Sequence, residues 1–247
     1  MKSLNSAKFL GRQYGGYTIL GLAGEGRYGV CYTAYSAEGV QVIIKRFKPS
    51  MMRKKREKNA FEAVLLSQLN HEAIPELLGV INEKGFYGFI LEQKPGVTIQ
   101  SLLVEKKHRF TDVEIYSIGT QLIDILQYLH TREIVHRDIR ISNVLVDKNK
   151  VSLVDFGLAR WADGNRYRYD VDFSFLGDFL LYLLYSSFVP HASGLPWHRE
   201  LPLTCEQKTF LKRLLRLEQP YENISAVKRD FILSLIHISE PTRHAQS

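Results

Sequence analysis

Cysteine is scarce in this sequence, and no apolar stretch is long. Cys31 and Cys205 are the only cysteines among the 247 residues, too few for the disulfide framework of a small secreted domain. The longest apolar stretch, residues 179–189, is interrupted by two serines and falls short of the roughly 20 residues that a membrane-spanning helix needs. Residues 1–11 lack the apolar core of a signal peptide. We therefore expect a cytoplasmic protein without a transmembrane segment.

Acidic residues are outnumbered by basic ones, which gives the chain a net charge of +7. Part of the excess lies in a basic run that starts at Arg46 and ends at Lys58. The first interpretation of such a run is a solvated helix face, and the alternative is a docking patch for an acidic protein, a nucleic acid or an anionic membrane. A nucleic-acid-binding module that rests on this run alone is the least favoured function. The remaining composition, 45% apolar and 24% charged residues, is that of a globular protein with one large domain or two lobes.

Two short polar segments carry the residues suited to chemistry. The first, residues 136–143, reads His-Arg-Asp-Ile-Arg-Ile-Ser-Asn, and the second, residues 155–157, reads Asp-Phe-Gly. The apolar runs between them predict a β-hairpin that holds Asn143 and Asp155 side by side. Mg²⁺ prefers oxygen ligands and usually takes only one or two from protein, while phosphates and water supply the rest. The pattern predicts a phosphoryl-transfer site, with the Asp138 carboxylate facing an incoming hydroxyl.

Together the two segments resemble the signature of the protein kinase family. The pattern H-R-D-x-x-x-x-N followed by D-F-G is matched at all seven fixed positions. Any one of these residues could be a turn aspartate or a buried histidine, but seven identities in order make that explanation poor. The resemblance implies that Asp138 is the catalytic base and that Asn143 and Asp155 bind Mg²⁺, or Mn²⁺ in its place. It points to a small bacterial-type serine/threonine kinase.

The N-terminal part of the chain contains a glycine-rich turn. Gly24, Gly26 and Gly29 lie between two strand-like runs, where their backbone N–H groups could approach phosphates. On its own this spacing is a weak signal, which would also fit a flexible hairpin. The chain continues as a strand, whereas a dinucleotide-binding Rossmann turn would be followed by a helix. By the resemblance, these glycines cover the phosphates of ATP.

Lys45 lies inside an apolar strand, which is unfavourable for a lysine unless it is paired. The helix predicted from about residue 54 to residue 69 offers Glu62 as the partner. Apolar residues on that helix predict a face against the sheet, namely Phe61, Val64, Leu65 and Leu69. In the family, the corresponding lysine holds the α- and β-phosphates and the glutamate holds the lysine. We therefore expect an ion pair between Lys45 and Glu62.

The resemblance assigns the remaining ATP contacts residue by residue. Glu92 and Lys94 would offer backbone hydrogen bonds to adenine from a hinge at residues 92–96, and Arg140 stands where serine/threonine kinases usually carry a lysine that touches the γ-phosphate. Further positions around the nucleotide are Cys31, Ile43 and Leu145. Ile43 replaces a small alanine and Cys31 replaces a valine, and overpacking of this kind costs ~1–3 kcal/mol when a site cannot relax.

The chain departs from the family pattern after the second polar segment. Asp172, expected to brace the backbone of the His136-Arg137-Asp138 turn from the central helix of the C-lobe, follows Asp155 by only 17 positions. No A-P-E motif occurs. The activation segment is therefore a short loop over residues 158–171, without serine or threonine.

Two consequences follow from the short activation segment. Tyr167 and Tyr169 are its only phosphorylatable side chains, so Arg137, which in the family often binds a phosphate on this loop, has no serine or threonine phosphate there to bind. Asn223 stands where the family has an arginine that pairs with the A-P-E glutamate. Both halves of that ion pair are absent, which avoids a buried unpaired charge.

The sequence therefore predicts an α+β, bilobal, protein-kinase-like fold. We expect a small β-rich N-lobe over residues 1–91, a hinge over 92–96, and a mostly helical C-lobe over 97–232 that lacks a full activation segment. Residues 233–247 resemble the in-frame translation of a sequencing adaptor. We expect them to be non-native, with the true C-terminus missing, and we exclude them from functional interpretation.

The leading functional hypothesis is an ATP- and Mg²⁺-dependent kinase that acts on a protein hydroxyl, of serine or threonine. Some tyrosine kinases place an arginine at the position of Arg140, so the acceptor type stays open. One alternative is a nucleotide-binding pseudokinase scaffold, favoured by Ile43 and Cys31. The other is a small-molecule phosphotransferase, favoured by the missing peptide-docking platform but disfavoured by the identities of Arg137, Phe156 and Gly157.

Overall fold

The computed structural model describes residues 7–26, 29–48, 56–83, 85–189 and 194–235. The chain divides into two compact units, residues 1–94 and 95–247, and the division falls inside the predicted hinge. Among the described helices, none combines the length and the apolar character needed to cross a membrane.

The first unit is built on a six-stranded antiparallel sheet with the strand order β1-β2-β3-β4-β6-β5. Its elements are η1 (Ala7–Phe9), β1 (Gln13–Tyr14), β2 (Tyr17–Glu25), β3 (Gly29–Tyr35), β4 (Gln41–Phe47), α2 (Arg56–Ser67), β5 (Leu77–Glu83) and β6 (Phe86–Glu92). Alternating β-branched and aromatic residues form these strands, since such side chains pack well on a pleated surface. One core cluster gathers the rings of Phe9, Tyr14, Tyr32 and Phe86.

Helix α2 confirms the predicted inner face in part, because Leu65 and Leu69 are buried. Phe61 and Val64 are 39% and 45% exposed, so their assignment to the core-facing side is wrong. The buried side chains are Glu62, Leu65 and Leu66 on the helix and Leu69 just after its end, at the i, i+3, i+4 and i+7 spacing of one helical face. Relative to the prediction, the helix is rotated about its axis so that Glu62 lies on the inner side, where it pairs with Lys45.

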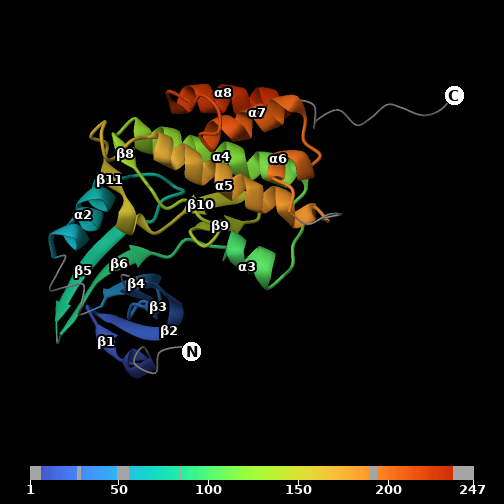
Figure 1. The fold of residues 1–247 in the computed structure, drawn as a ribbon. Coiled ribbons are helices and arrows are strands. Elements are labelled where there is room, and N and C mark those ends of the chain that lie inside the picture. Colours follow the sequence, from blue (N-terminus) through green and yellow to red (C-terminus); the bar gives the residue numbers. More distant parts are fainter. Residues whose placement is uncertain (1–6, 27–28, 49–55, 84, 190–193, 236–247) are drawn as a thin grey trace. The chain divides into compact units, whose positions relative to one another are not determined.

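The second unit is mostly helical. Its helices are α3 (Ile99–Val104), α4 (Asp112–His130), η2 (Phe156–Leu158), α5 (Asp170–Ser187), α6 (Trp197–Glu200), α7 (Cys205–Leu214) and α8 (Ile224–Leu235). Its strands are β7 (Val97–Thr98), β8 (Ile134–Val135), β9 (Val144–Asp147), β10 (Lys150–Leu153) and β11 (Arg160–Trp161). Figure 1 shows α4 and α5 packed together, with α7 and α8 across one side and the β9–β10 hairpin on the other.

Helix α4 forms the centre of the second unit. Thr111 and Glu114 make a capping box at its start, which satisfies N–H groups that the first turn leaves without partners. Apolar residues at helical spacing in its sequence predict a stripe that packs into the core. All five members of that stripe are buried: Ile115, Ile118, Leu122, Ile125 and Leu129. Gly119 lies on the same helix where the ring of Phe231 from α8 crosses it.

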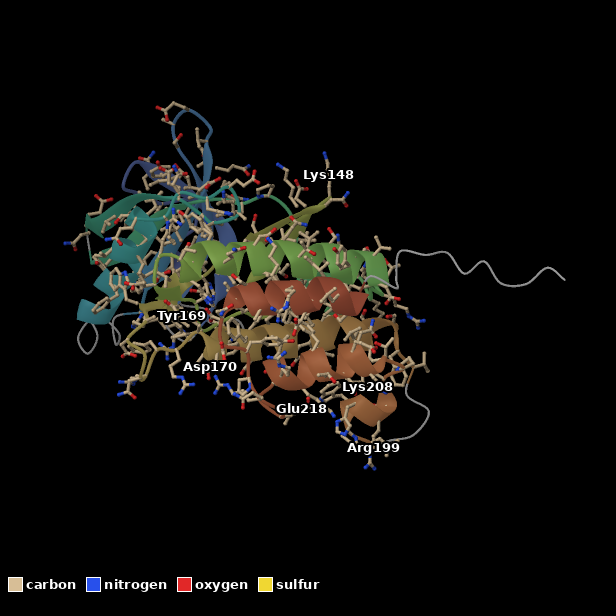
Figure 2. All side chains as sticks on the ribbon, turned by 90° about the horizontal axis from the view of Figure 1, so that it is seen from above. Lys148, Tyr169, Asp170, Arg199, Lys208 and Glu218 are labelled. Atoms are coloured by element: carbon tan, nitrogen blue, oxygen red, sulfur yellow. The ribbon has the colours of Figure 1, made fainter. Side chains whose placement is uncertain are left out.

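The predicted hairpin is also confirmed. Strands β9 and β10 pair antiparallel, with Asp147 opposite Lys150, so Lys148 and Asn149 alone make the turn. Lys148 has a φ of 54°, the left-handed conformation that two-residue hairpin turns require. Figure 2 shows Lys148 at the tip of this hairpin. The first polar segment ends just before β9, and the second begins just after β10. The hairpin therefore fixes the spacing between the two segments.

The last helix of the described chain, α8, extends to Leu235. The first three residues of the segment that resembles an adaptor therefore continue this helix, and residues 236–247 lie outside the described residues. At its other end, the Asn223 side chain accepts a hydrogen bond from the Ala226 backbone N–H at 2.9 Å. Asn223 thus caps α8, a role that its position in the sequence did not indicate.

Substitution of Gly119 tests the packing of α4 against α8. An added Cβ would lie 2.3 Å from Cζ of Phe231. We expect Gly119→Ala to lower the free energy of unfolding by about 1–3 kcal/mol, because overpacking outweighs the roughly 1 kcal/mol that alanine gains in helix propensity. Urea unfolding measures the change. Phe231→Leu should cost less in the Gly119→Ala background than alone, and a Gly119→Ala protein as stable as wild type would contradict the close contact.

Candidate active site

The first polar segment is held in place by the buried carboxylate of Asp172. Its Oδ2 accepts a hydrogen bond from the His136 backbone N–H at 2.9 Å, and its Oδ1 accepts one from the Arg137 N–H at 2.7 Å. Nε2 of His130 lies 3.0 Å from Oδ2. The predicted brace is therefore present. Arg137 has a φ of 67°, which costs a residue with a side chain about 1–3 kcal/mol, and the two bonds to a charged acceptor offset this cost.

His136 lies inside this scaffold and is fully buried. Its ring meets the Phe156 ring edge-on at 4.7 Å between centroids, and its Nδ1 accepts a hydrogen bond from the Asp138 N–H at 3.3 Å. Burial lowers the pKa of His136, although the carboxylates of Asp172, Asp155 and Asp138 act in the opposite direction. The imidazole is therefore neutral near pH 7, as an acceptor at Nδ1 requires.

Asp138 is buried and contacts two other predicted site residues. Nδ2 of Asn143 donates hydrogen bonds to its backbone carbonyl at 2.9 Å and to its Oδ2 at 3.0 Å. The guanidinium of Arg140 binds the other carboxylate oxygen, Oδ1. The Arg140 side chain is 57% exposed, so it can change partners at little cost in desolvation. The Asp138 carboxylate is thereby bound by one neutral donor, the Asn143 amide, and by one exposed cation, the Arg140 guanidinium.

The hairpin places the second polar segment next to Asn143. The Val154 backbone N–H donates to the Asn143 carbonyl at 2.9 Å. Asp155 directly follows Val154 in the chain, so its backbone lies close to that of Asn143. Asp155 adopts a left-handed φ of 64°, and its Oδ1 accepts a hydrogen bond from the Gly157 N–H at 3.2 Å. Its side chain is exposed, whereas Asn143 is buried.

Asn143 and Asp155 offer an amide oxygen and a carboxylate, a donor set that fits Mg²⁺. Hard oxygen donors, few in number, leave room for phosphate and water ligands. Within the described part of the chain, no group of three or more histidine, cysteine, aspartate or glutamate side chains gathers as a metal site. Asn143 and Asp155 therefore stay the predicted ligands of a divalent cation.

The first unit contains the predicted ion pair. Nζ of Lys45 lies 2.6 Å from Oε1 of Glu62, and the two side chains are 7% and 2% exposed. Lys45 on β4 is opposite Cys31 on β3, and Ile43 is opposite Leu91 on β6. A lysine this buried needs its partner, because removal of one charge of a buried pair costs about 3–5 kcal/mol.

The three glycines differ in their structural roles. At Gly29 an added Cβ would lie 2.5 Å from the Arg46 carbonyl oxygen, so glycine is required for β3 to approach β4. At Gly24 and Gly26, by contrast, an added Cβ would have no atom of the described residues within 4 Å. Packing therefore explains Gly29, whereas Gly24 and Gly26 leave open space beside the backbone that a ligand could use.

The remaining predicted nucleotide contacts lie in both units. Lys94 is anchored by its side chain, whose Nζ donates to Oε1 of Glu92 at 2.8 Å and to the Glu72 carbonyl at 2.7 Å. The Glu92 N–H donates to the Glu76 carbonyl at 2.9 Å. Leu145 lies on β9, opposite Ser152.

Two basic side chains at the start of the run are described, and both have partners within the first unit. The Arg46 guanidinium lies over the Phe9 ring, 4.2 Å from its centroid, and Lys48 pairs with Glu25 at 3.0 Å. The rest of the run lies almost wholly outside the described residues, and the side chain of Lys58 is not described. The proposed docking patch therefore stays a prediction.

Two contacts of the scaffold were not predicted from the sequence. His130 bonds Asp172 from the last turn of α4, and the ring of Tyr167 lies against the Arg137 guanidinium. Each joins segments that are distant along the chain, and no spacing pattern links them. For Tyr167, the absence of serine and threonine from the loop was the available signal.

Comparison with known proteins agrees with this geometry. The sequence profile described as "Protein kinase domain" matches residues 17–175, which include both polar segments and end inside α5. The Bacillus subtilis protein named "Probable serine/threonine-protein kinase YbdM" is 32% identical over 237 residues, 93% of this chain and 92% of that protein. Serine/threonine-protein kinase 10-A of Xenopus laevis is 28% identical over 144 residues, 58% of this chain and 15% of that protein. The CTD kinase subunit alpha of Schizosaccharomyces pombe is 33% identical over 153 residues, 59% of this chain and 25% of that protein.

The chain therefore belongs to the protein kinase family. It is an enzyme of the phosphotransferase class, and the predicted α+β kinase fold is confirmed. Its match to the Bacillus protein extends over almost the whole of both chains, whereas the other two relatives are several times longer than the part they share with it.

Replacement of Asp172 tests how it braces the turn of residues 136–138, the catalytic turn. In Asp172→Ala, two buried backbone N–H groups and His130 lose a charged acceptor. We expect the free energy of unfolding to fall by roughly 2–5 kcal/mol, as measured by urea unfolding. Asp178→Ala, an exposed acid of the same helix, should change it by less than about 0.5 kcal/mol. Equal losses in the two variants would contradict the brace.

Stability should depend on pH through His136. Its pKa is lowered in the folded state from the usual 6.5, so the unfolded chain takes up the proton first. The contribution is fully present above pH 6.5 and is lost as the pH falls below it, toward the lower pKa of the folded state. We expect the unfolding temperature of wild type to fall more steeply between about pH 7 and pH 5 than that of His136→Asn, whose amide oxygen can replace Nδ1 as acceptor. Parallel profiles would show that another group sets the dependence.

Proposed function

We propose that this kinase transfers the γ-phosphoryl group of ATP, with Mg²⁺, to a serine or threonine hydroxyl of a protein. The observation that carries the proposal is the contact of Asp138 with Asn143, next to Asp155 on the same hairpin. In this proposal, one scaffold would carry a carboxylate for the acceptor and two oxygen donors for a cation. Phosphoryl transfer depends on such positioning and on charge neutralisation more than on covalent chemistry.

The second unit supplies the groups that act on the transferred phosphoryl group. Asn143 and Asp155 would hold Mg²⁺, which neutralises charge on the phosphates when it is bound. Asp138 would orient the acceptor hydroxyl and accept its proton. Arg140, now bound to Asp138, is exposed enough to turn toward the γ-phosphate, a stronger anionic partner. Its charge is kept during this exchange, although its planar geometry differs from that of a lysine.

The first unit supplies the groups that hold the nucleotide. Lys45, aimed by Glu62, would bind the α- and β-phosphates, and the backbone at Gly24 and Gly26 would cover the β- and γ-phosphates. Around adenine we assign the backbone of Glu92 and Lys94 and the side chains of Cys31, Ile43 and Leu145. A cytoplasmic location, expected from the scarcity of cysteine, is part of this proposal.

The choice of a protein acceptor rests on the relatives. The names of the Bacillus and Xenopus proteins describe them as serine/threonine-protein kinases, and the former aligns with nearly all of this chain. The scaffold alternative has only Ile43 and Cys31 in its favour. The open space at Gly24 and Gly26 and the complete set of charged residues favour an active enzyme.

Radiolabelled ATP tests the proposal directly. Wild type with Mg²⁺ should label itself or a general protein substrate, with the label on serine or threonine. Asp155→Ala should reduce the rate by about 10²-fold or more, because it removes one of two protein ligands of the cation. Asp178→Ala is the matched control, an acid on α5 that no step uses, and it should retain the wild-type rate.

The other outcomes separate the alternatives. Equal, negligible labelling by wild type and Asp155→Ala, with a nucleotide that still raises the unfolding temperature, would establish the scaffold function. Transfer to a panel of sugars or amino alcohols but to no protein would establish the small-molecule phosphotransferase.

A further inference from the structure

Arg137 bridges the two ends of the short activation loop. Its Nη1 donates a hydrogen bond to the Leu158 carbonyl at 3.1 Å, and its guanidinium carbon lies 4.7 Å from the centroid of the Tyr167 ring. A guanidinium over an aromatic face is attracted by the negative charge of the ring face. The same residue is bound to Asp172 through its backbone, so it connects the loop to the catalytic turn.

The loop is built to hold Tyr167 in this position. Its first part pairs with the strand that precedes His136, because β11 and β8 are antiparallel partners and the Ala162 N–H donates to the Glu133 carbonyl at 2.6 Å. A closed turn follows. The Asp163 carboxylate accepts hydrogen bonds from the backbone N–H groups of Asn165 at 3.0 Å and Tyr167 at 2.8 Å, and the Asp163 N–H donates to the Tyr167 carbonyl at 3.2 Å.

The carboxylates of the loop are committed to other partners. Asp163 closes the turn just described, and the bond from the Tyr167 N–H, with those from its neighbours, lowers the pKa of Asp163, so this carboxylate stays ionised at neutral pH. Asp170 binds Arg168 at 3.1 Å and Arg216 at 3.5 Å. Figure 2 shows Tyr169 and Asp170 where the loop enters α5. Within the loop, the ring of Tyr167 is therefore the group presented to Arg137.

We infer that Tyr167 is a positioning residue for the kinase reaction, and that its ring replaces a loop phosphate as the partner of Arg137. The inference rests on the proposed function. The side chain of Arg137, fixed by the ring and the Leu158 carbonyl, stabilises the left-handed backbone that precedes Asp138. The loop is thereby ordered without phosphorylation, and the aromatic ring, not the hydroxyl of Tyr167, is what the enzyme needs.

Substitutions that separate the ring from the hydroxyl test this inference. Tyr167→Phe keeps the ring, and we expect its kcat within about twofold of wild type. Tyr167→Leu removes the ring, and we expect kcat to fall about three- to thirty-fold, the range that a cation–π contact spans, with little change in the KM for ATP. Tyr182→Leu, at an exposed tyrosine of α5, is the matched control and should behave as wild type.

A double-mutant cycle identifies the route by which Tyr167 acts. In an Arg137→Gln background, Tyr167→Leu should lower kcat by less than about twofold, because the Arg137 guanidinium is already gone. Arg166, whose guanidinium lies 5.5 Å from the centroid of the Tyr167 ring, is present in both backgrounds. Additive losses would show that Tyr167 acts elsewhere. Wild-type protein treated with phosphatase and verified by mass as unphosphorylated should retain its activity, and loss of activity together with a mapped phosphate at Tyr167 or Tyr169 would overturn the inference.

Hydrogen exchange tests the inference independently of phosphate transfer. Amides of residues 158–169 should exchange at least about fivefold faster in Tyr167→Leu than in wild type, whereas Tyr167→Phe should be unchanged. This result distinguishes the two proposals, since a protein that transfers no phosphate can still show the loop ordered by the ring. Unchanged exchange in Tyr167→Leu would show that the ring does not order the loop.

Discussion

The conformation of the catalytic turn in the second unit depends on the carboxylate of Asp172. This buried group accepts most of its hydrogen bonds from backbone N–H groups. It is fully buried, and water cannot solvate it. Its compensation comes from the N–H groups of His136 and Arg137 and from His130. Because two of these donors are backbone N–H groups, the carboxylate imposes one geometry on the turn, including the left-handed conformation of Arg137. A neutral side chain in its place would leave those N–H groups without an acceptor at considerable cost.

The same turn explains how a shortened activation segment can still serve a kinase. Its first half forms a strand pair with residues that lead into the turn, and its second half is closed by Asp163 and Tyr167. Arg137 contacts both halves. The family pattern with a long segment and an A-P-E anchor is replaced by local contacts, and Asn223, no longer needed opposite that anchor, caps α8.

Features that depend on local pattern or on the family signature were predictable from the sequence. The hairpin between the polar segments, helix α4 and the Lys45–Glu62 pair are of this kind, since turn length, apolar spacing and a charge inside an apolar strand each carry a physical signal. The inner face of α2 was not predictable, because Phe61 and Val64 satisfy the same apolar spacing as the residues that are buried. The contact between Tyr167 and Arg137 depends on the path of an irregular loop, and two-residue strands such as β11 carry too little sequence to be recognised. The start of α5 at Asp170 lies inside the loop predicted over residues 158–171, which shows the usual uncertainty of helix boundaries.

The bonds that fix the catalytic turn also have a bearing on how the protein folds. The most distant pair among them, His130 and Asp172, is 42 residues apart along the chain, and the contact of Arg137 with Leu158 spans 21. Contacts of short sequence separation lose little loop-closure entropy and form quickly. The turn that aims Asp138 is thus encoded within one continuous stretch of polypeptide, and we expect it to take shape before the later helices α7 and α8 complete the unit.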